Sequence, residues 1–95
     1  MNHPSVVRMF GVCEHGSNLF LVTELLEQSL QDLITTGQQP STVVCLAIAH
    51  DVAAGMCFLH ALDVIHRDLK PGNVLLDEQL RGKVWARVYS PCVLA

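Results

Sequence analysis

The run from His66 to Asn73 gathers a carboxylate, two cations and an amide on one short stretch of chain. Its sequence is His-Arg-Asp-Leu-Lys-Pro-Gly-Asn, and charged side chains of this kind are almost never fully buried unless they are paired. Pro71 and Gly72 break the helical periodicity that precedes them, so we expect a loop that leads into the short apolar run 74–76. Because catalytic groups are often carried by loops on a rigid scaffold, this loop is the candidate functional site.

The length and the charge of the chain limit what can surround this loop. A chain of 95 residues holds one small domain at most. Its formal net charge is −3 and its six lysines and arginines form no basic run, so the sequence gives no electrostatic case for nucleic acid as a partner. The four cysteines form no C-x-x-C pair and no secretory signal pattern opens the chain. We therefore expect a reduced, cytoplasmic setting with buried free thiols, in preference to a metal site at Cys57 and His60.

The longest apolar stretch, residues 43–65, raises the question of a membrane span. Asp51 lies near its centre, where an acidic residue costs about 2.5 to 3.5 kcal/mol on insertion scales, and His50 adds a second polar group. We therefore expect a helix of a soluble domain and no membrane span. Its apolar residues recur at spacings of four, four, four and three, which predicts one buried face. They are Val44, Ile48, Val52, Met56 and Leu59. Asp51 is expected to be solvated or locally hydrogen-bonded.

The segment before this helix reads as a hairpin followed by a short helix. Residues 6–13 and 19–26 are apolar, strand-like runs, and residues 14–18 between them are typical of a turn. Ser29 and Asp32 form a capping-box pattern, which predicts a helix of about two turns that ends near Thr36-Gly37. Ser41 or Thr42 is placed to cap the long helix.

After the loop, the sequence predicts a second, smaller hairpin and then a tail. Residues 74–76 read as a short strand, residues 77–82 as a turn, and Lys83-Val84 as the start of the partner strand. Apolar and polar residues alternate from 83 to 89, so this strand could continue as far as Ser90-Pro91.

Three of these segments resemble eukaryotic protein kinases. The loop meets all five fixed positions of the kinase catalytic-loop pattern H-R-D-L-x-x-x-N. The first hairpin is similar to the H-P-N-I-V-type and V-x-E-type segments that lead to the kinase hinge, and residues 49–60 are close to the run I-A-x-D-V-A-x-G-M-x-Y-L-H. The resemblance implies an α+β, partial protein-kinase-like fold over residues 1–84, with the hinge hairpin of the small lobe and the first helices and catalytic loop of the large lobe. Residues 85–95 form a tail that departs from the family.

The resemblance also implies roles for individual residues. Asp68 would be the catalytic base, Lys70 would neutralise the transferred phosphoryl group, and Asn73 would be a ligand of Mg²⁺. His66 would pack inward, and Arg67 would pair with a phosphorylated activation segment. Contacts with ATP would come from the gatekeeper, the hinge and one residue after the loop: Thr23, Glu24, Leu25, Leu26 and Leu75. Lys70 followed by Pro71 resembles the serine/threonine type, and the hairpin and long helix look like its tyrosine-kinase-like branch.

The chain departs from the family pattern after Val84. Kinases continue there with a small residue and Asp-Phe-Gly, whereas this chain reads Trp85-Ala86-Arg87 and has no acidic residue after Glu78. No Lys precedes Lys70 and no glycine-rich phosphate loop precedes the hairpin. Two functions remain open. The chain either represents a serine/threonine kinase acting on protein hydroxyls, truncated and inactive in isolation, or is a catalytically dead kinase-like binding or interaction module. We expect exposed apolar surface that favours association or aggregation, and hence a poorly soluble or molten product.

Overall fold

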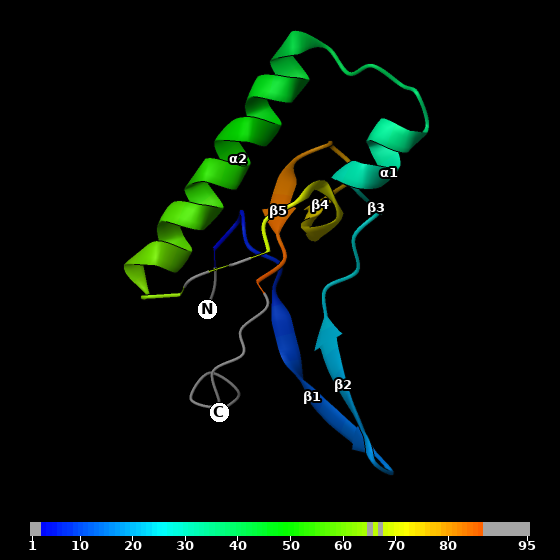
Figure 1. Ribbon diagram of the computed structural model, residues 1–95, viewed down its shortest axis with the longest axis vertical. Coiled ribbons are helices and arrows are strands. Elements are labelled where there is room, and N and C mark those ends of the chain that lie inside the picture. The colour runs from blue at the N-terminus through cyan, green and yellow to red at the C-terminus, as the bar shows by residue number, and fades with distance from the viewer. Residues whose placement is uncertain (1–2, 65, 67, 87–95) are drawn as a thin grey trace.

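The computed structural model describes residues 3–64, 66 and 68–86, and it has the predicted α+β class (Figure 1). Two antiparallel sheets and a long helix make up most of it (Figure 1). The elements in chain order are β1 (Met9–His15), β2 (Asn18–Thr23), β3 (Gln28–Ser29), α1 (Leu30–Thr35), α2 (Thr42–Ala61), the 3-10 helix η1 (Pro71–Asn73), β4 (Val74–Leu76) and β5 (Gly82–Val84).

The first hairpin, β1 and β2, extends away from the rest of the molecule (Figure 1). Its turn lies at Gly16-Ser17, where Gly16 has a φ of +63°, a left-handed conformation that glycine adopts without steric cost. The two strands pair in antiparallel register, with Val12 opposite Leu21. The prediction of a hairpin is confirmed, although its second strand ends at Thr23 and its first begins at Met9.

The second sheet has the order β3-β4-β5 and is antiparallel throughout. The predicted hairpin of β4 and β5 is confirmed, whereas the two-residue strand β3 was not predicted. The segment before β1 adds to this sheet, because the Val7 N–H donates to the Val84 oxygen at 3.0 Å and the Val84 N–H donates to the Ser5 oxygen at 2.8 Å. Residues 5–7 thus lie beside β5, although the sequence reads as the start of the first strand.

Side-chain caps fix the starts of both helices. The Ser29 hydroxyl accepts from the Asp32 N–H at 3.1 Å, and the Asp32 carboxylate accepts from the Ser29 N–H at 2.9 Å, which is the predicted capping box. The Ser41 hydroxyl accepts from the Val44 N–H at 3.3 Å and caps α2. Of the two candidate caps, Ser41 is therefore the cap and Thr42 is the first helical residue.

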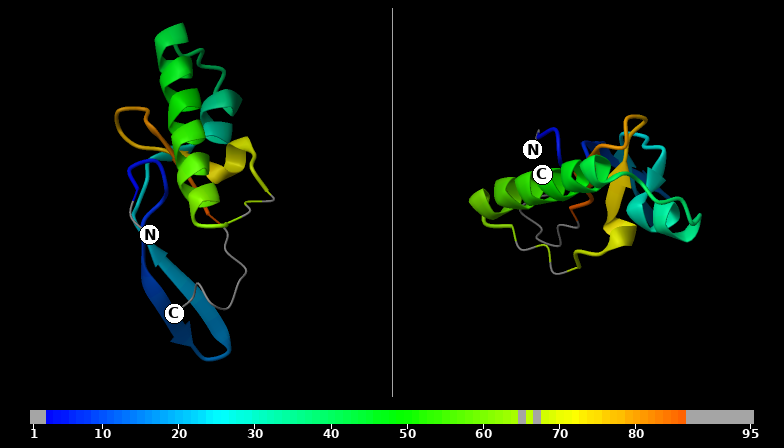
Figure 2. Two further views of the ribbon diagram at one scale, coloured as in Figure 1. Left: turned by 90° about the vertical axis from the view of Figure 1, so that its left-hand side faces the viewer. Right: turned by 90° about the horizontal axis from the view of Figure 1, so that it is seen from above.

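Helix α2 packs across β4 and β5, while the first hairpin extends away from it (Figure 2). One buried cluster joins α1, α2 and β4, and consists of Leu33, Ile48, Val74 and Leu76. The other joins the N-terminal segment, α2 and β5, and consists of Val6, Leu59 and Val84. The five predicted apolar positions of α2 are all buried or half-buried, so the predicted inward face is confirmed.

The prediction of buried thiols is wrong for the three cysteines that the structure describes. Cys13, Cys45 and Cys57 are free and exposed. Cys13 lies on the projecting hairpin, and Cys45 and Cys57 lie on α2 outside its inward face, so apolar character did not bring these side chains into either core cluster. Cys92 lies outside the described residues.

Helix α2 is also long and apolar enough to cross a membrane, judged by length and composition alone. One such helix is weak evidence, because the core helix of a soluble protein passes the same test. Here α2 contributes Ile48 and Leu59 to the core, and it holds the buried carboxylate of Asp51.

Gly55 marks the closest approach between α2 and the N-terminal segment. A Cβ at this position would lie 2.5 Å from the Ser5 oxygen and 3.2 Å from Val84 Cγ2. The Ser5 oxygen cannot retreat freely, because it accepts the Val84 N–H. In an open helix Gly→Ala stabilises by about 1 kcal/mol, but here we expect Gly55→Ala to destabilise the fold by about 1 to 3 kcal/mol through overpacking.

Urea unfolding at neutral pH tests this expectation, with Gly11→Ala as the control. A Cβ at Gly11 would meet nothing within 4 Å, so this variant should unfold within about 0.5 kcal/mol of the wild type. A Gly55→Ala protein as stable as Gly11→Ala would show that α2 and residue 5 do not approach as described.

Candidate active site

The 3-10 helix η1 connects the polar loop to strand β4. Pro71 stands at the first turn of this helix, where its missing N–H leaves no bond unmade. The turn brings Asn73 back to Asp68: the Asn73 amide nitrogen lies 2.8 Å from the Asp68 backbone oxygen and 3.2 Å from its Oδ2. Lys70 Nζ lies 3.6 Å from the same Oδ2, and the Lys70 side chain is 58% exposed. The three loop residues selected from the sequence therefore form one cluster.

Hydrogen bonds of His66 connect this loop to the segment after β5. Its side chain is buried, and its Nε2 lies 2.5 Å from the backbone oxygen of Trp85. Since a carbonyl can only accept, Nε2 carries the proton, which leaves Nδ1 to accept from the Asp68 N–H at 3.3 Å. The Trp85 N–H in turn donates to the backbone oxygen of Asn73 at 2.8 Å. The inward position predicted for His66 is thus observed, and its partner Trp85 was not predicted. Arg67 lies outside the described residues.

These bonds also explain why β5 ends where it does. The Trp85 N–H still donates to the backbone oxygen of Asn73, the residue opposite it in the register of β4 and β5. The Trp85 oxygen, however, binds His66, and the Asn73 N–H donates to the Lys70 oxygen, so the pairing goes no further. The predicted continuation of the strand is therefore wrong for Trp85 and Ala86, and residues 87–90 of that prediction lie outside the described residues.

The residues assigned to the hinge follow directly from β2. Thr23 ends the strand and its hydroxyl donates to the Glu24 oxygen at 3.3 Å. The Glu24 N–H donates to the Arg8 oxygen at 2.9 Å, and its carboxylate accepts the Arg8 N–H at 2.7 Å. Leu25 is 98% exposed, whereas Leu26 is half-buried. In the segment after β2, the Glu24 side chain is therefore held inward and the next side chain, Leu25, lies in solvent.

The carboxylate of Glu24 is held by a cation from the other sheet. Lys83 Nζ lies 2.6 Å from Glu24 Oε1, and both side chains are about one-fifth exposed. Burial alone would raise the pKa of Glu24, but the hydrogen bonds from Lys83 and from the Arg8 N–H outweigh it and lower the pKa below its ordinary value. The Glu24 side chain is thus ionised and engaged, and its N–H is bonded to the Arg8 oxygen, so its backbone oxygen is the group that can accept a further hydrogen bond from a ligand.

This ion pair connects the hinge residues to Leu75. In the sheet, Lys83 on β5 lies directly opposite Leu75 on β4, and directly opposite residues of antiparallel strands share a face. The half-buried Leu75 is therefore beside the cation that holds Glu24. The structure thus joins Asp68, Lys70 and Asn73 in one cluster, and it connects Glu24 through Lys83 to the strand that pairs with Leu75.

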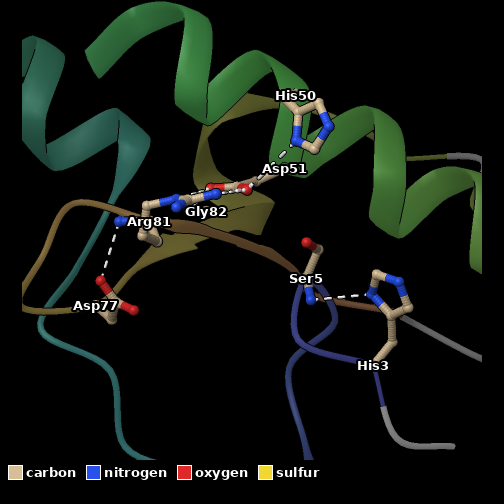
Figure 3. Close-up of polar contacts among 7 residues, drawn as sticks. All are labelled: His3, Ser5, His50, Asp51, Asp77, Arg81 and Gly82. Atoms are coloured by element: carbon tan, nitrogen blue, oxygen red, sulfur yellow. Dashed lines mark hydrogen bonds and ion pairs between the residues drawn. The ribbon is translucent and has the colours of Figure 1, made fainter. Parts of the chain in front are cut away.

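An ion pair between the buried carboxylate of Asp51 and the exposed Arg81 was missed from the sequence (Figure 3). Asp51 was expected to be solvated or locally bonded, and this expectation is wrong, because its side chain is buried and its partners are 30 and 31 residues away. Arg81 binds it in bidentate fashion, with Nε 2.8 Å from Oδ2 and a terminal nitrogen 2.6 Å from Oδ1, and the Gly82 N–H donates to Oδ2 at 2.9 Å (Figure 3).

The Arg81 hydrogen bond lowers the pKa of Asp51 and outweighs burial, which would raise it. Arg81 is itself positioned by Asp77, whose Oδ1 accepts the Arg81 N–H at 3.0 Å (Figure 3). The pair thus fixes the turn between β4 and β5 against the middle of α2. Both of its charges are engaged within the fold, so the pair is structural.

The fit of this site to Mg²⁺ is incomplete. Asn73 uses its amide nitrogen on Asp68, which leaves its oxygen, a ligand type that Mg²⁺ accepts. The next side chains near the loop are those of Trp85 and Ala86, and neither offers a hard oxygen. Among the described residues, no group of three His, Cys, Asp or Glu side chains could hold a metal ion.

Comparison with known proteins gives consistent matches. The sequence model of the protein kinase domain matches residues 1–85. L-type lectin-domain containing receptor kinase V.9 of Arabidopsis thaliana is 36% identical over 90 residues, covering 88% of this chain and 14% of that protein. Receptor protein kinase WSS1 of Oryza sativa subsp. japonica is 43% identical over 93 residues, covering 88% and 10%. Serine/threonine-protein kinase pkn2 of Myxococcus xanthus is 38% identical over 84 residues, covering 87% and 10%. The chain therefore spans only a small part of these relatives.

Proposed function

Because the chain belongs to the protein kinase family, we propose that it carries the hinge and the catalytic loop of a serine/threonine protein kinase. Such an enzyme transfers the γ-phosphate of ATP to protein hydroxyls, and the family generally uses ATP and Mg²⁺. The observation that carries the proposal is the bond from Asn73 to both the backbone and the carboxylate of Asp68, with Lys70 beside them.

This geometry supports a division of labour within the loop. Asp68 is half-buried and held on its backbone and side chain by Asn73, so its carboxylate has a fixed direction in which to accept a proton from a substrate hydroxyl. Lys70 is close to that carboxylate but mostly exposed, so its ammonium can meet the charge of a phosphoryl group. Asn73 positions Asp68 and offers its amide oxygen as a single metal ligand.

In the complete enzyme, the proposed nucleotide contacts are the backbone of the segment after β2 and the apolar side chains near it. The side chain of Glu24 is engaged by Lys83 and its N–H by the Arg8 oxygen, which leaves the Glu24 oxygen and the backbone of residues 25–26 to meet the adenine. Thr23 and Leu75 would border the ring. When bound, Mg²⁺ would neutralise the phosphates, but Asn73 alone does not hold it, so we derive no step through the metal.

We further propose that the chain is inactive by itself. A general base such as Asp68 supplies only about 10²- to 10⁴-fold, and most of phosphoryl transfer depends on positioning and metal electrostatics. The second candidate function, a catalytically dead binding or interaction module, is favoured by one observation: His66, Asp68 and Asn73 keep their hydrogen bonds to one another and to Trp85 although Ala86 stands where a metal ligand is needed.

The remaining assignments follow from the same proposal. Residues 1–84 would be the kinase part and residues 85–95 a separate tail. A protein substrate would be the partner of a longer, active form. A cytoplasmic location is supported by the free thiols of Cys13, Cys45 and Cys57.

A phosphotransfer assay tests the proposed function. The purified chain, Mg²⁺, labelled ATP and a generic protein substrate should give no incorporation above background, while an active kinase assayed in parallel confirms the conditions. Turnover by the wild-type chain that disappears in Asp68→Asn would contradict the proposed inactivity and show that the loop assembles a working site without the missing ligand.

A further inference from the structure

Trp85 lies on the face of β4 and β5 that is opposite to α2. Val84 belongs to a buried cluster with Leu59 of α2, and successive side chains of a strand point to opposite faces. The Trp85 N–H donates to the backbone oxygen of Asn73, so the pairing of the strands still reaches residue 85. Ala86 packs against the same buried cluster as Val84, which completes the alternation and places Trp85 on the other face.

The same face carries residues that are proposed to meet a nucleotide. Lys83, two residues before Trp85, binds Glu24 at 2.6 Å and lies directly opposite Leu75. Leu75 is therefore the diagonal neighbour of Trp85 across the two strands, and diagonal neighbours are about 7 to 8 Å apart, within reach of an aromatic side chain. Asn73, the residue opposite Trp85, belongs to the loop cluster. Trp85 thus neighbours a proposed adenine contact and a proposed metal ligand.

The indole of Trp85 is a large group held in place on this face. Trp85 is half-buried, although neither core cluster of the described residues includes it. A tryptophan side chain can bury about 150 to 250 Å², so it covers much of the face between the two strands. The backbone of Trp85 is bound on both sides, at its N–H by Asn73 and at its oxygen by His66. The indole therefore cannot move away together with its backbone.

We propose that the indole of Trp85 occupies the space beside Leu75 that adenine would take, and so excludes a purine nucleotide from this chain independently of the missing metal ligand. An indole and a purine are both flat, fused bicyclic rings of the same size, so the two cannot share this space. The inference rests on the proposed function, because it takes Leu75 and the segment after β2 as adenine contacts. Trp85 is then a specificity-determining residue, whereas Ala86 affects the phosphates.

Adenosine is the probe that separates these two effects, because it has no phosphate and needs no metal ion. Its binding to the full 95-residue chain is measured by NMR from the shifts of backbone amides. We expect Trp85→Ala to bind adenosine at least about tenfold more tightly than the wild type, since forcing a ligand against a packed side chain carries the cost of overpacking. Trp85→Leu, which keeps an apolar side chain without the ring, should change binding in the same direction.

Phe20→Ala is the matched control, because it removes an aromatic ring that is 51% exposed on β2, outside the face that carries Trp85. Its affinity for adenosine should stay within about twofold of the wild type. Slow exchange of the Val84 amide, which donates to the Ser5 oxygen, shows that each variant keeps the fold around β5.

Fluorescence gives a second readout that needs no variant, because Trp85 is the only tryptophan of the chain. Adenosine should leave the wild-type emission unchanged. Saturable quenching would overturn the inference, since it would show that adenine stacks on the indole and is not excluded by it.

The positions of the shifted amides separate a failure of this inference from a failure of the proposed function. Equal adenosine binding by the wild type and both Trp85 variants, with shifts at residues 24–26, would overturn the inference and leave the proposed adenine contacts in place. Variants that keep the fold but bind no adenosine, or bind it without shifts at residues 24–26, would overturn the proposed adenine contacts and the inference together.

Discussion

Asp51→Asn is expected to lower the free energy of unfolding by about 2 kcal/mol at neutral pH, since hydrogen bonds to charged groups each contribute about 1.5 to 3 kcal/mol. The buried carboxylate accepts from Arg81 twice and from the Gly82 N–H once, and an amide in its place can accept at only one of its two terminal atoms. The loss stays near the lower end because Arg81 is 54% exposed and can turn to water when its partner is neutral.

Urea unfolding followed by circular dichroism measures this effect, and His50→Gln is its control. His50 Nδ1 lies 3.9 Å from Asp51 Oδ1, but the His50 side chain is 78% exposed, so its replacement should change stability by less than about 0.5 kcal/mol. An Asp51→Asn protein as stable as His50→Gln would mean that the Arg81 pair does not hold the turn against α2.

The same pair predicts how stability depends on pH. The folded pKa of Asp51 lies below its ordinary value of 3.8, so the stability that it contributes is present above about pH 3.8 and is lost as the pH falls through the folded pKa. Glu24 acts in the same direction from its ordinary value of 4.5. Because Glu24 is present in both proteins, the wild type should lose stability more steeply than Asp51→Asn only as the pH is lowered below about 3.8.

The local features of this fold could be predicted from the sequence, because their signals lie within a few residues of each other. Ser29 and Asp32 of the capping box are three positions apart, and the inward face of α2 repeats along one helix. The loop cluster of Asp68, Lys70 and Asn73 is equally local, since η1 brings residues five apart into contact. In each case the geometry follows from the local conformation of one continuous segment of backbone.

Features that depend on tertiary contacts could not be predicted in this way. Lys83 and Glu24 are 59 residues apart and Arg81 and Asp51 are 30 apart, and nothing in either neighbourhood specifies the partner. Strand β3 has two residues, too few to show a period, and it exists because Gln28 and Ser29 pair with β4. The exposed Cys13 has a similar cause: its apolar neighbours indicate burial only if another element covers the hairpin.

The identity of residue 86 is expected to have the largest effect on catalysis. Strand β5 and the bond between His66 and Trp85 place the chain beside the loop. Ala86 follows, at the position where the family has the metal-binding Asp. A metal ion supplies several kcal/mol of charge stabilisation to a transferring phosphoryl group. Restoring the ligand should therefore raise phosphoryl transfer by at least about a thousandfold, provided that the rest of the kinase domain is present.

A chimaera provides that setting. Small-lobe elements and an activation segment from an active serine/threonine kinase would be joined to residues 1–84, followed either by the native Trp85-Ala86-Arg87-Val88 or by these four positions replaced with Ala-Asp-Phe-Gly. Asp68→Asn in the second version is the control, since it removes the proposed base and leaves the restored metal ligand in place. Its activity should fall by about 10²- to 10⁴-fold, the share that a general base supplies.

The most direct measurement is Mg²⁺-dependent phosphoryl transfer by the two chimaeras under identical conditions. We predict turnover by the Asp-Phe-Gly version that requires Asp68, and none above background by the version with the native residues 85–88. Equal Mg²⁺-dependent ATP binding and turnover by the native version would contradict the account, because Trp85 to Val88 would then supply what a metal ligand at position 86 supplies in the family.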